Sequence, residues 1–417
     1  MTGKKNNSNN RELSKRHCMV VHAYYPFGET RVERQAQALL TNGIEVDVIC
    51  LGGSSQPAQA TIDGVQVYRL PVQRNKGGSF VAQLFEYLAF FVLASICLSK
   101  LHLRRHYDVV QVHNLPDFLV FVALIPKLTG ASIILDLHDL MPEFYAERIQ
   151  LSMNSFPVRL IRWQEYLSCR LANHVITVTE LWRQSLIERG QPADRVSVVM
   201  NVADDRVFNR DTVAAMSTDN DHNSVQCEAA DGRFRLIYHG VMDYRHGLDL
   251  ALEAINLVRR SAPEVHLTLH GGGPYRATLV SLTDELGLQD NVQFSNRLVP
   301  TVELPKLLRE ADLAIVPYRD GLFTGEILPT KLMEYAALGI PSIAARTPAI
   351  ATYFDETMIE FFTPGSVDDL VGSIMKLYED RTLLTKLANG AEKFNRHYNW
   401  ARVSAEYVAL VEKLGAR

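Results

Sequence analysis

Short apolar segments alternate with helical segments along most of this 417-residue chain. The first repeat has an apolar run at 17–22, a loop that contains Gly28, a helix from about Arg31 to Leu40 and a second apolar run at 44–51. Further apolar runs follow at 108–113, 131–137, 174–178 and 196–199. Apolar strands that are separated by helices predict a parallel sheet covered by helices on both faces.

The stretch 211–232 interrupts this alternation. It is rich in Ser, Thr, Asn and Asp, and its lack of apolar periodicity predicts an exposed loop. The alternation then restarts, with predicted strands at 234–238, 265–269, 292–294 and 313–317. We therefore predict an α/β fold with two doubly wound domains, 17–202 and 203–390, facing a cleft. Ligands bind at the carboxyl ends of strands in such sheets, so each domain is expected to form one wall.

Bulk composition excludes several classes of protein. A hydrophobic content of 47%, a charged content of 22% and a net charge of −4 describe an ordinary globular protein and argue against a nucleic-acid partner. The five cysteines form no C-x-x-C pair, which predicts neither a disulfide framework nor a zinc site and fits a reducing cytoplasm. Residues 1–16 are polar, lack the apolar core of a signal peptide and are predicted to be a disordered lead-in.

An apolar segment at 81–98 stands out within the first predicted domain. Gln83 and Glu86 interrupt it, so its uninterrupted part is too short for a membrane span of roughly 20 residues. Basic residues and histidines follow it directly, ending with Arg104, Arg105 and His106. An apolar helix with a basic flank is suited to a membrane interface. The alternatives are a buried helix of the first domain and a true span.

Polar residues gather where predicted strands end. The densest cluster follows the strand at 131–137 and contains Asp136, His138 and Asp139. A histidine beside a carboxylate is oriented by it and its pKa is raised, which suits contact with a sugar hydroxyl or a reacting oxygen. The alternative is a capping or packing role for His138. A second cluster, 113–117, follows the preceding strand.

Two glutamates, Glu326 and Glu334, stand eight positions apart in the second predicted domain. Pro329 suits the first position of a helix and Gly339 the position just past its end, so Glu326 is expected in a loop and Glu334 on the second turn. A helix N-terminus suits a phosphate, and carboxylates beside it can accept hydrogen bonds from sugar hydroxyls. The alternative is a surface helix with two solvated glutamates.

Two glycine-containing loops precede this helix. The loop 240–247 begins with Gly240 and carries Arg245, which can bind a phosphate with two parallel hydrogen bonds. The second loop, 271–273, is a run of glycines that includes Gly272. Neither G-x-G-x-x-G after the first strand nor G-x-x-x-x-G-K-[ST] occurs, which disfavours dinucleotide binding and P-loop ATP hydrolysis.

Taken together, these motifs resemble the retaining glycosyltransferases of the GT-B fold, group 1, family 4 type, which build bacterial polysaccharides and glycolipids. The most specific part is the order of motifs in the second domain: the loop 240–247, the glycine run, 291–294, 311–317, the two glutamates and 339–341. In the first domain the likeness lies in 31–34, 136–139 and 198–201. The closing Tyr398-Asn399-Trp400 is also similar, and it implies that a C-terminal helix, 391–417, crosses back to the first domain.

The resemblance implies roles for matching positions. Glu334 would bind the ribose, Glu326 the donor sugar and Arg245 the diphosphate. Catalytic roles fall on His138, Asp139 and Glu326, and donor-binding roles on Gly28, Gly240, Arg245, Gly272, Arg297, Lys331 and Glu334. No cofactor or metal would be required. The family's usual basic residues are replaced here by Val241 and His246, so Arg245 or Lys331 would carry the charge.

The expected function is therefore transfer of a sugar from a nucleotide-sugar donor, a UDP- or GDP-sugar, to a hydroxyl of a sugar or lipid-linked acceptor. The enzyme would act in polysaccharide or glycolipid synthesis, with retention of configuration. We expect it in the cytoplasm, with attachment to the inner face of the membrane as a further expectation. A nucleotide-sugar epimerase of the same fold is the alternative.

Overall fold

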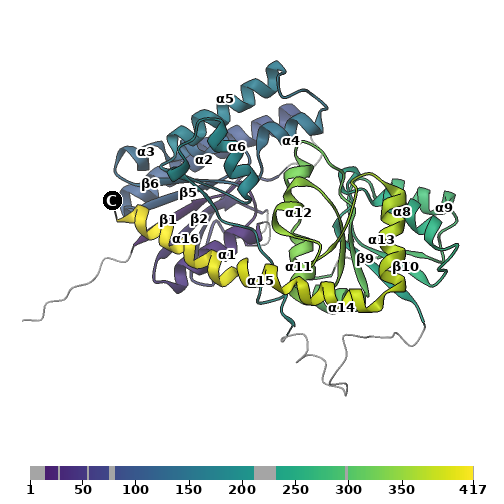
Figure 1. Ribbon diagram of the computed structural model, residues 1–417. Helices are drawn as coiled ribbons and strands as arrows, with labels where there is room; N and C mark the ends of the chain where they lie inside the picture. Colours follow the sequence, from purple (N-terminus) through teal and green to yellow (C-terminus); the bar gives the residue numbers. More distant parts are fainter. Residues whose placement is uncertain are drawn as a thin grey trace, which may run out of the picture. The chain divides into compact units, whose positions relative to one another are not determined.

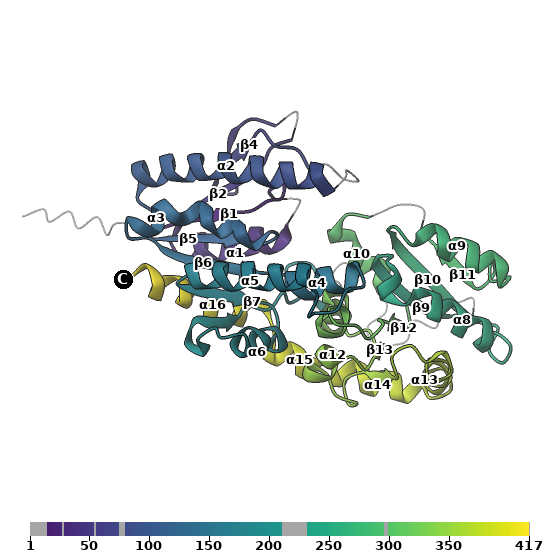
Figure 2. The same ribbon diagram turned by 90° about the horizontal axis from the view of Figure 1, so that it is seen from above.

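The computed structural model describes residues 15–26, 29–53, 56–74, 80–210, 232–295 and 299–416. The chain forms two compact units (Figures 1 and 2). The first runs to Val199 and takes up the chain again from Val403, and the second is Met200–Arg402. Gly28, Arg297 and the predicted loop at 211–231 lie outside the described residues.

The first unit is built on an eight-stranded sheet of order β3-β4-β2-β1-β5-β6-β7-β8. Every pair of neighbours is parallel except β3 and β4, an antiparallel pair at the edge. The strands are β1 (Arg16–Val20), β2 (Glu45–Leu51), β3 (Gln59–Ile62), β4 (Val65–Leu70), β5 (Val109–His113), β6 (Ser132–Leu137), β7 (His174–Thr177) and β8 (Val196–Val198). The four strands β1, β2, β5 and β6 are almost wholly buried, as expected for apolar strands covered on both faces.

Helices cover both faces of this sheet. The helices are α1 (Thr30–Thr41), α2 (Phe80–Arg105), α3 (Leu124–Leu128), α4 (Met141–Arg148), α5 (Phe156–Leu171) and α6 (Glu180–Glu188), with 3-10 turns at Asp117–Ala123 and Ala193–Arg195. Figure 1 shows α2 and α5 on one face and α1 on the other. The connection between β5 and β6 is a 3-10 turn followed by the short helix α3.

The last helix, α16 (Trp400–Gly415), belongs largely to the first unit. Its Tyr407 hydroxyl donates to Oε1 of Gln111 on β5 at 2.6 Å, and the Leu414 carbonyl accepts from Ser132 at 2.9 Å. These contacts bring the end of the chain onto the same sheet as its beginning, beside α1 (Figure 1). The C-terminal helix implied by the sequence resemblance is confirmed.

The second unit has a six-stranded, all-parallel sheet of order β11-β10-β9-β12-β13-β14. Its strands are β9 (Phe234–Val241), β10 (Val265–Gly272), β11 (Val292–Phe294), β12 (Leu313–Val316), β13 (Ser342–Ala345) and β14 (Glu360–Phe362). Its helices are α8 (Leu248–Val258), α9 (Arg276–Glu285), α10 (Leu304–Leu308), α11 (Thr330–Leu338), α12 (Pro348–Tyr353), α13 (Val367–Glu379), α14 (Arg381–Gly390) and α15 (Glu392–His397), with 3-10 turns at Tyr244–His246, Thr301–Glu303 and Thr324–Glu326. The doubly wound α/β architecture is confirmed in both units.

Helix α2 contacts its unit along a single stripe. Glu86, Phe90, Ala94, Leu98 and His102 recur every four residues and are buried. The opposite side exposes large apolar side chains: Leu84, Phe85, Leu88, Val92, Ile96 and Leu103. Ala82–Arg105 is long and apolar enough to cross a membrane by length and composition, and only 17% of its most apolar window is buried. The alternative of a buried helix of the first domain therefore does not fit α2, because a core helix would bury both sides.

Candidate active site

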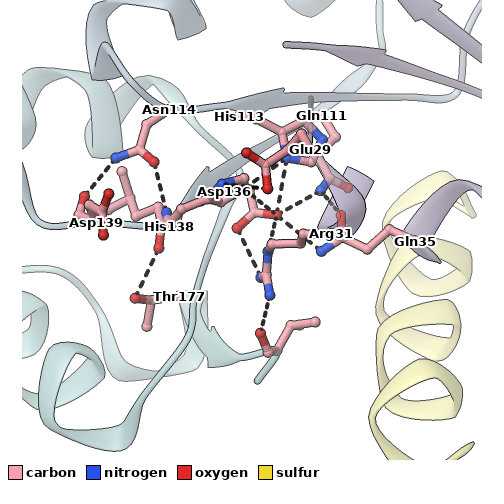
Figure 3. Close-up of polar contacts among 12 residues, drawn as sticks. Glu29, Arg31, Gln35, Gln111, His113, Asn114, Asp136, His138, Asp139 and Thr177 are labelled. Atoms are coloured by element: carbon pink, nitrogen blue, oxygen red, sulfur yellow. Dashed lines mark hydrogen bonds and ion pairs between the residues drawn. The ribbon is translucent and has the colours of Figure 1, made fainter. Parts of the chain in front are cut away.

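Asp136, near the carboxyl end of β6, is the centre of a buried polar cluster in the first unit (Figure 3). Arg31 at the start of α1 donates hydrogen bonds to both carboxylate oxygens of Asp136, with Nε 3.1 Å from Oδ2 and Nη2 3.0 Å from Oδ1. The same guanidinium donates through Nη1 to the carbonyl of Val199 at 2.6 Å. A two-point arginine–carboxylate pair fixes orientation as well as charge, so the start of α1 is tied to the end of β6.

Two amides complete the shell around this carboxylate. The Nε2 atoms of Gln35 and Gln111 each lie 3.1 Å from Oδ2 of Asp136. Burial alone would raise the pKa of Asp136, but the charge of Arg31 and the surrounding donors hold it well below its usual range. Asp136 is therefore a fixed negative charge rather than a proton donor.

Two histidines from neighbouring strand ends meet at this carboxylate. His113 Nδ1 lies 3.3 Å from Oδ2 of Asp136, and His138 Nε2 lies 3.5 Å from the same oxygen and 3.1 Å from His113 Nδ1. Burial lowers the pKa of His113, which keeps it neutral. Burial acts the same way on His138, but the negative charge of Asp136 outweighs it and raises the pKa of His138. His138 is thus the histidine of this pair whose protonated form the cluster favours.

Asn114 fixes the backbone that carries His138. Its Oδ1 accepts from the backbone N–H of His138 at 2.7 Å, and its Nδ2 donates to the carbonyl of Asp139 at 2.7 Å (Figure 3). The same Nδ2 also donates to Oδ1 of Asp117 at 2.9 Å. Asp117 is fully buried, and burial raises its pKa to about 8. Asn114 thus holds the backbone of His138 in place, and the chemical role of His138 stays a prediction.

His113, Asp136 and His138 each place one possible metal-ligand atom within 4.8 Å of the others. A metal ion can bridge atoms at this spacing. Two features disfavour a cation here. The guanidinium of Arg31 already neutralises Asp136, and Oδ2 accepts hydrogen bonds from Gln35 and Gln111. A divalent ion would have to displace these donors and lie beside a fixed positive charge.

Glu334 on α11 is positioned by the end of β9 in the second unit. Its Oε2 lies 2.6 Å from Nε2 of His239, whose Nδ1 lies 2.8 Å from the hydroxyl of Tyr335. That hydroxyl also accepts from the backbone N–H of His239 at 3.1 Å. The arrangement restrains one carboxylate oxygen of Glu334, whose side chain is partly exposed. A fixed carboxylate with an accessible edge is suited to accept hydrogen bonds from a diol.

Lys331, in the first turn of the same helix, is buried in a cage of aromatic rings. Its Nζ donates to the hydroxyls of Tyr318 at 2.7 Å and Tyr238 at 3.2 Å and lies over both rings. Burial disfavours the charged form of Lys331 and would lower its pKa. The two tyrosine oxygens have the larger, opposite effect, so the pKa of Lys331 is raised. A Cβ on Gly240, which has φ +121°, would lie 3.4 Å from Nζ. Glycine therefore lets the end of β9 approach the ammonium.

The loop after β9 is held by a buried histidine. His246 Nδ1 lies 2.7 Å from the carbonyl of Val241, and its ring stacks on Tyr318 at 4.5 Å. Burial and the nearby Lys331 lower the pKa of His246 to about 3, so it carries no charge. Where the resemblance leads one to expect a basic side chain, His246 is therefore neutral, and Lys331 supplies the buried positive charge.

Arg245 and Glu326 are linked through Phe323. The Arg245 guanidinium lies over the Phe323 ring, 5.5 Å from its centroid, and within the described residues its Nε has no hydrogen-bond partner. Glu326 ends the 3-10 turn that begins just after Phe323. Helix α11 begins at Thr330, with Pro329 one position before it rather than at its first position. Gly339 ends the helix at φ +70°, as predicted.

The structure thus places the predicted residues in two groups. His138 and Asp139 lie around Asn114 in the first unit. In the second unit, Gly240 lies near the end of β9, Arg245 and Glu326 lie in 3-10 turns, and Lys331 and Glu334 lie on α11. Gly272 ends β10 beside Val241, in open space. Sequence reasoning missed His239 as the partner of Glu334, although it stands at a strand end like the residues that were singled out. Nothing in the sequence marks Gln35 or Gln111 as partners of Asp136.

Two Rossmann-like units, with the carboxyl ends of parallel strands carrying these groups, define a two-domain fold of the GT-B class. The model for glycosyl transferases group 1 matches residues 219–394, and the model for the glycosyl transferase 4-like domain matches residues 28–201. The chain belongs to the group 1 glycosyltransferases.

Named relatives and solved structures agree with this assignment. Chitobiosyldiphosphodolichol beta-mannosyltransferase of Debaryomyces hansenii is 22% identical over 359 residues, 81% of this chain and 75% of that protein. A GDP-mannose-dependent alpha-(1-6)-phosphatidylinositol monomannoside mannosyltransferase of Mycolicibacterium smegmatis is 36% identical over 106 residues, only 25% of this chain and 27% of that protein. Sucrose-phosphate synthase from Thermosynechococcus elongatus has the same fold, with a TM-score of 0.77 at 17% identity over 96% of this chain and 99% of that one.

Proposed function

We propose that this glycosyltransferase moves a sugar from a nucleoside diphosphate sugar to a hydroxyl of a lipid-linked acceptor. The carrying observation is that Glu334 and Lys331 lie on the same helix, α11, one turn apart and next to the end of β9. Glu334, restrained by His239, accepts hydrogen bonds from the ribose hydroxyls. The positive end of α11 and the ammonium of Lys331 stabilise the diphosphate.

The reaction leaves negative charge on the departing diphosphate, and this charge must be stabilised. Tyr238 and Tyr318 hold the ammonium of Lys331 in place by hydrogen bonds. A positive charge that is already in position stabilises the diphosphate without rearrangement as the reaction proceeds. Arg245 supplies a second positive charge from the loop after β9, and its buried Nε has no hydrogen-bond partner among the described residues. We infer that these two residues replace the basic side chains absent at 241 and 246, so the transfer needs no metal.

His138 is the residue of the first unit that we assign to the chemistry. The charge of Asp136 raises the pKa of His138, and its Oδ2 lies 3.5 Å from Nε2 of His138. The other ring nitrogen, Nδ1, lies 4.0 Å from Glu29 and does not contact Asp136. We propose that it hydrogen-bonds the donor sugar or the reacting hydroxyl, with Asp139 and Glu326 as further polar contacts. The predicted retention of configuration remains part of this proposal. The two mannosyltransferases named above carry alpha and beta linkages in their names.

The relatives guide the choice of substrates. One is named as GDP-mannose-dependent, and the names of both mannosyltransferases contain a lipid, dolichol or phosphatidylinositol. A third relative, AmsK of Erwinia amylovora, is 22% identical over 55% of this chain and 54% of its own length and is named for amylovoran biosynthesis. We therefore propose GDP-mannose as the first donor to test and a UDP-sugar as the second. The exposed apolar side of α2 supports attachment to the inner face of the membrane, where a lipid-linked acceptor is reached.

The test is a transfer assay with GDP-mannose and UDP-glucose, a membrane lipid extract as acceptor, and EDTA in a parallel reaction. Glycolipid product that forms equally with EDTA, and whose anomeric configuration by NMR matches the donor, is the expected result. His138→Ala should lower turnover about 100-fold or more while donor affinity stays within a few-fold. Conversion of the free nucleotide sugar into an epimer without any acceptor would instead identify the alternative, an epimerase.

A further inference from the structure

The outer side of α5 is a second exposed apolar surface, which neither the site nor α2 accounts for. Phe156, Leu160 and Trp163 recur at helical spacing and are 78%, 53% and 59% exposed. The side that faces the sheet buries Val158, Glu165, Ser168 and Cys169 instead. Scattered exposed apolar residues are common, but an aligned row that ends in a tryptophan marks an interaction surface.

Arginines accompany this row. Arg159 and Arg170 are exposed on the same side of α5, and Arg162 lies at its margin. Within the described part of the chain, the guanidinium groups of Arg159 and Arg162 take part in neither an ion pair nor a hydrogen bond. Arg189 of the neighbouring segment differs, because it is bound by the buried carboxylates of Glu165 and Glu143. The positive charge of Arg159 and Arg162 is thus available to an outside partner.

A groove of about 290 Å³ runs along these residues. Arg159, Arg162, Trp163 and Tyr166 line it from α5, and Leu186 and Arg189 line its other side. The groove therefore joins an aromatic wall to the guanidinium groups of Arg159 and Arg162, while the buried Glu165, which also lines it, attracts Arg162 electrostatically. Phosphate takes paired hydrogen bonds from arginine, and Trp and Tyr favour the level of lipid headgroups, with the apolar ring on one side and the polar atom in water.

We propose that the outer side of α5, Phe156 to Arg170, binds the surface of an anionic phospholipid bilayer, with the lipid phosphates at Arg159 and Arg162. Charge complementarity selects this occupant, because a row of apolar side chains interleaved with unpaired arginines matches acyl chains beneath anionic headgroups. Figures 1 and 2 place α5 on the same face of the first sheet as α2. Both exposed apolar helices can therefore meet one bilayer. The inference extends the membrane attachment proposed through α2, but it does not depend on the transfer reaction.

The experiment is vesicle co-sedimentation of the full chain with phosphatidylcholine vesicles, with and without phosphatidylglycerol. We expect binding that requires phosphatidylglycerol and weakens with salt. The double variant Arg159→Glu/Arg162→Glu should bind at least tenfold more weakly, and Trp163→Ser should also weaken binding. The matched control, Lys386→Glu/Arg396→Glu, reverses two exposed positive charges in the second unit and should bind like the wild type.

Several outcomes overturn the proposal. These are equal binding to vesicles without phosphatidylglycerol, no binding to either kind, and unchanged binding of both α5 variants. Sedimentation velocity adds one more, because a dimer that Trp163→Ser dissociates would show that a second copy covers this surface. Since all the substituted side chains are at least partly exposed, thermal melting should change little in every variant. Loss of vesicle binding with normal nucleotide-sugar binding would leave the transferase proposal standing.

Discussion

At the scale of single residues, Asp136 determines the state of the first-unit cluster. It is fully buried, and Arg31, Gln35 and Gln111 all donate to it. Asp136→Asn would leave Arg31 buried beside an uncharged amide, and breaking a buried pair in this way costs roughly 3–5 kcal/mol. Urea unfolding should show a loss of that size. The exposed Asp290→Asn should remain within about 0.5 kcal/mol of the wild type.

The contribution of Asp136 to the free energy of unfolding changes with pH in a definite direction. The folded-state pKa of Asp136 lies well below its usual range, so its stabilising contribution is complete above the unfolded pKa of about 3.9 and is lost as the pH falls further. The wild type should therefore lose unfolding free energy more steeply below pH 4 than Asp136→Asn. If the unfolding free energies of the two proteins fell with equal slope below pH 4, the role of the ion pair would be contradicted.

His138 gives a spectroscopic prediction at the same scale. Asp136 raises its folded-state pKa, so its contribution to stability is complete below the unfolded value of about 6.5 and is lost as the pH rises through the folded pKa. A histidine NMR titration should place His138 above 6.5, while His113 stays neutral because burial lowers its pKa. Asp136→Asn should move His138 downward. A titration of His138 at or below 6.5 in the wild type would contradict the assignment.

At the scale of elements, the glycine just before α8 is a tightly constrained turn position beside the site. Gly247 has φ +65°, and a Cβ there would lie 2.0 Å from the carbonyl oxygen of Pro317. Gly287 has nearly the same φ, +62°, with nothing within 4 Å. Both Ala variants incur the left-handed penalty of about 1–2 kcal/mol, but Gly247→Ala must also displace backbone. Thermal unfolding should show Gly247→Ala at least about 2 kcal/mol less stable than Gly287→Ala, and equal losses would contradict the close approach.

Local pattern predicted much of the element order. Most of the strands, α1, the Gly339 end of α11 and the restart of the alternation after 232 follow from apolar runs, glycines and prolines, because these act over a few neighbouring residues. The strands β3, β4 and β14 and the 3-10 turn at Asp117–Ala123 were not predicted, since pairing near a sheet edge and tight turns depend on the rest of the sheet. Arg31, Gln35 and Gln111, which donate to Asp136, lie 25 to 105 positions away along the chain, a separation that no local pattern encodes.

At the scale of the whole molecule, the residues with proposed roles are divided between two units. The first unit holds His138 in a shell tied to α1, and α16 closes onto its sheet through Tyr407. The second unit contains Lys331, Glu334 and Arg245 on its own elements. Since the proposed nucleotide contacts all lie in the second unit, a nucleotide alone should protect amides of 200–402 from hydrogen exchange.

The most direct test of the account is calorimetric titration of GDP-mannose and UDP-glucose into the wild type, Glu334→Ala and the exposed control Glu379→Gln. The account predicts that one of the two donors binds the wild type and the control equally. Glu334→Ala should weaken that binding at least about tenfold while its melting temperature stays nearly unchanged. A Glu334→Ala protein with wild-type donor affinity would contradict the assignment of α11 and the end of β9 as the nucleotide site.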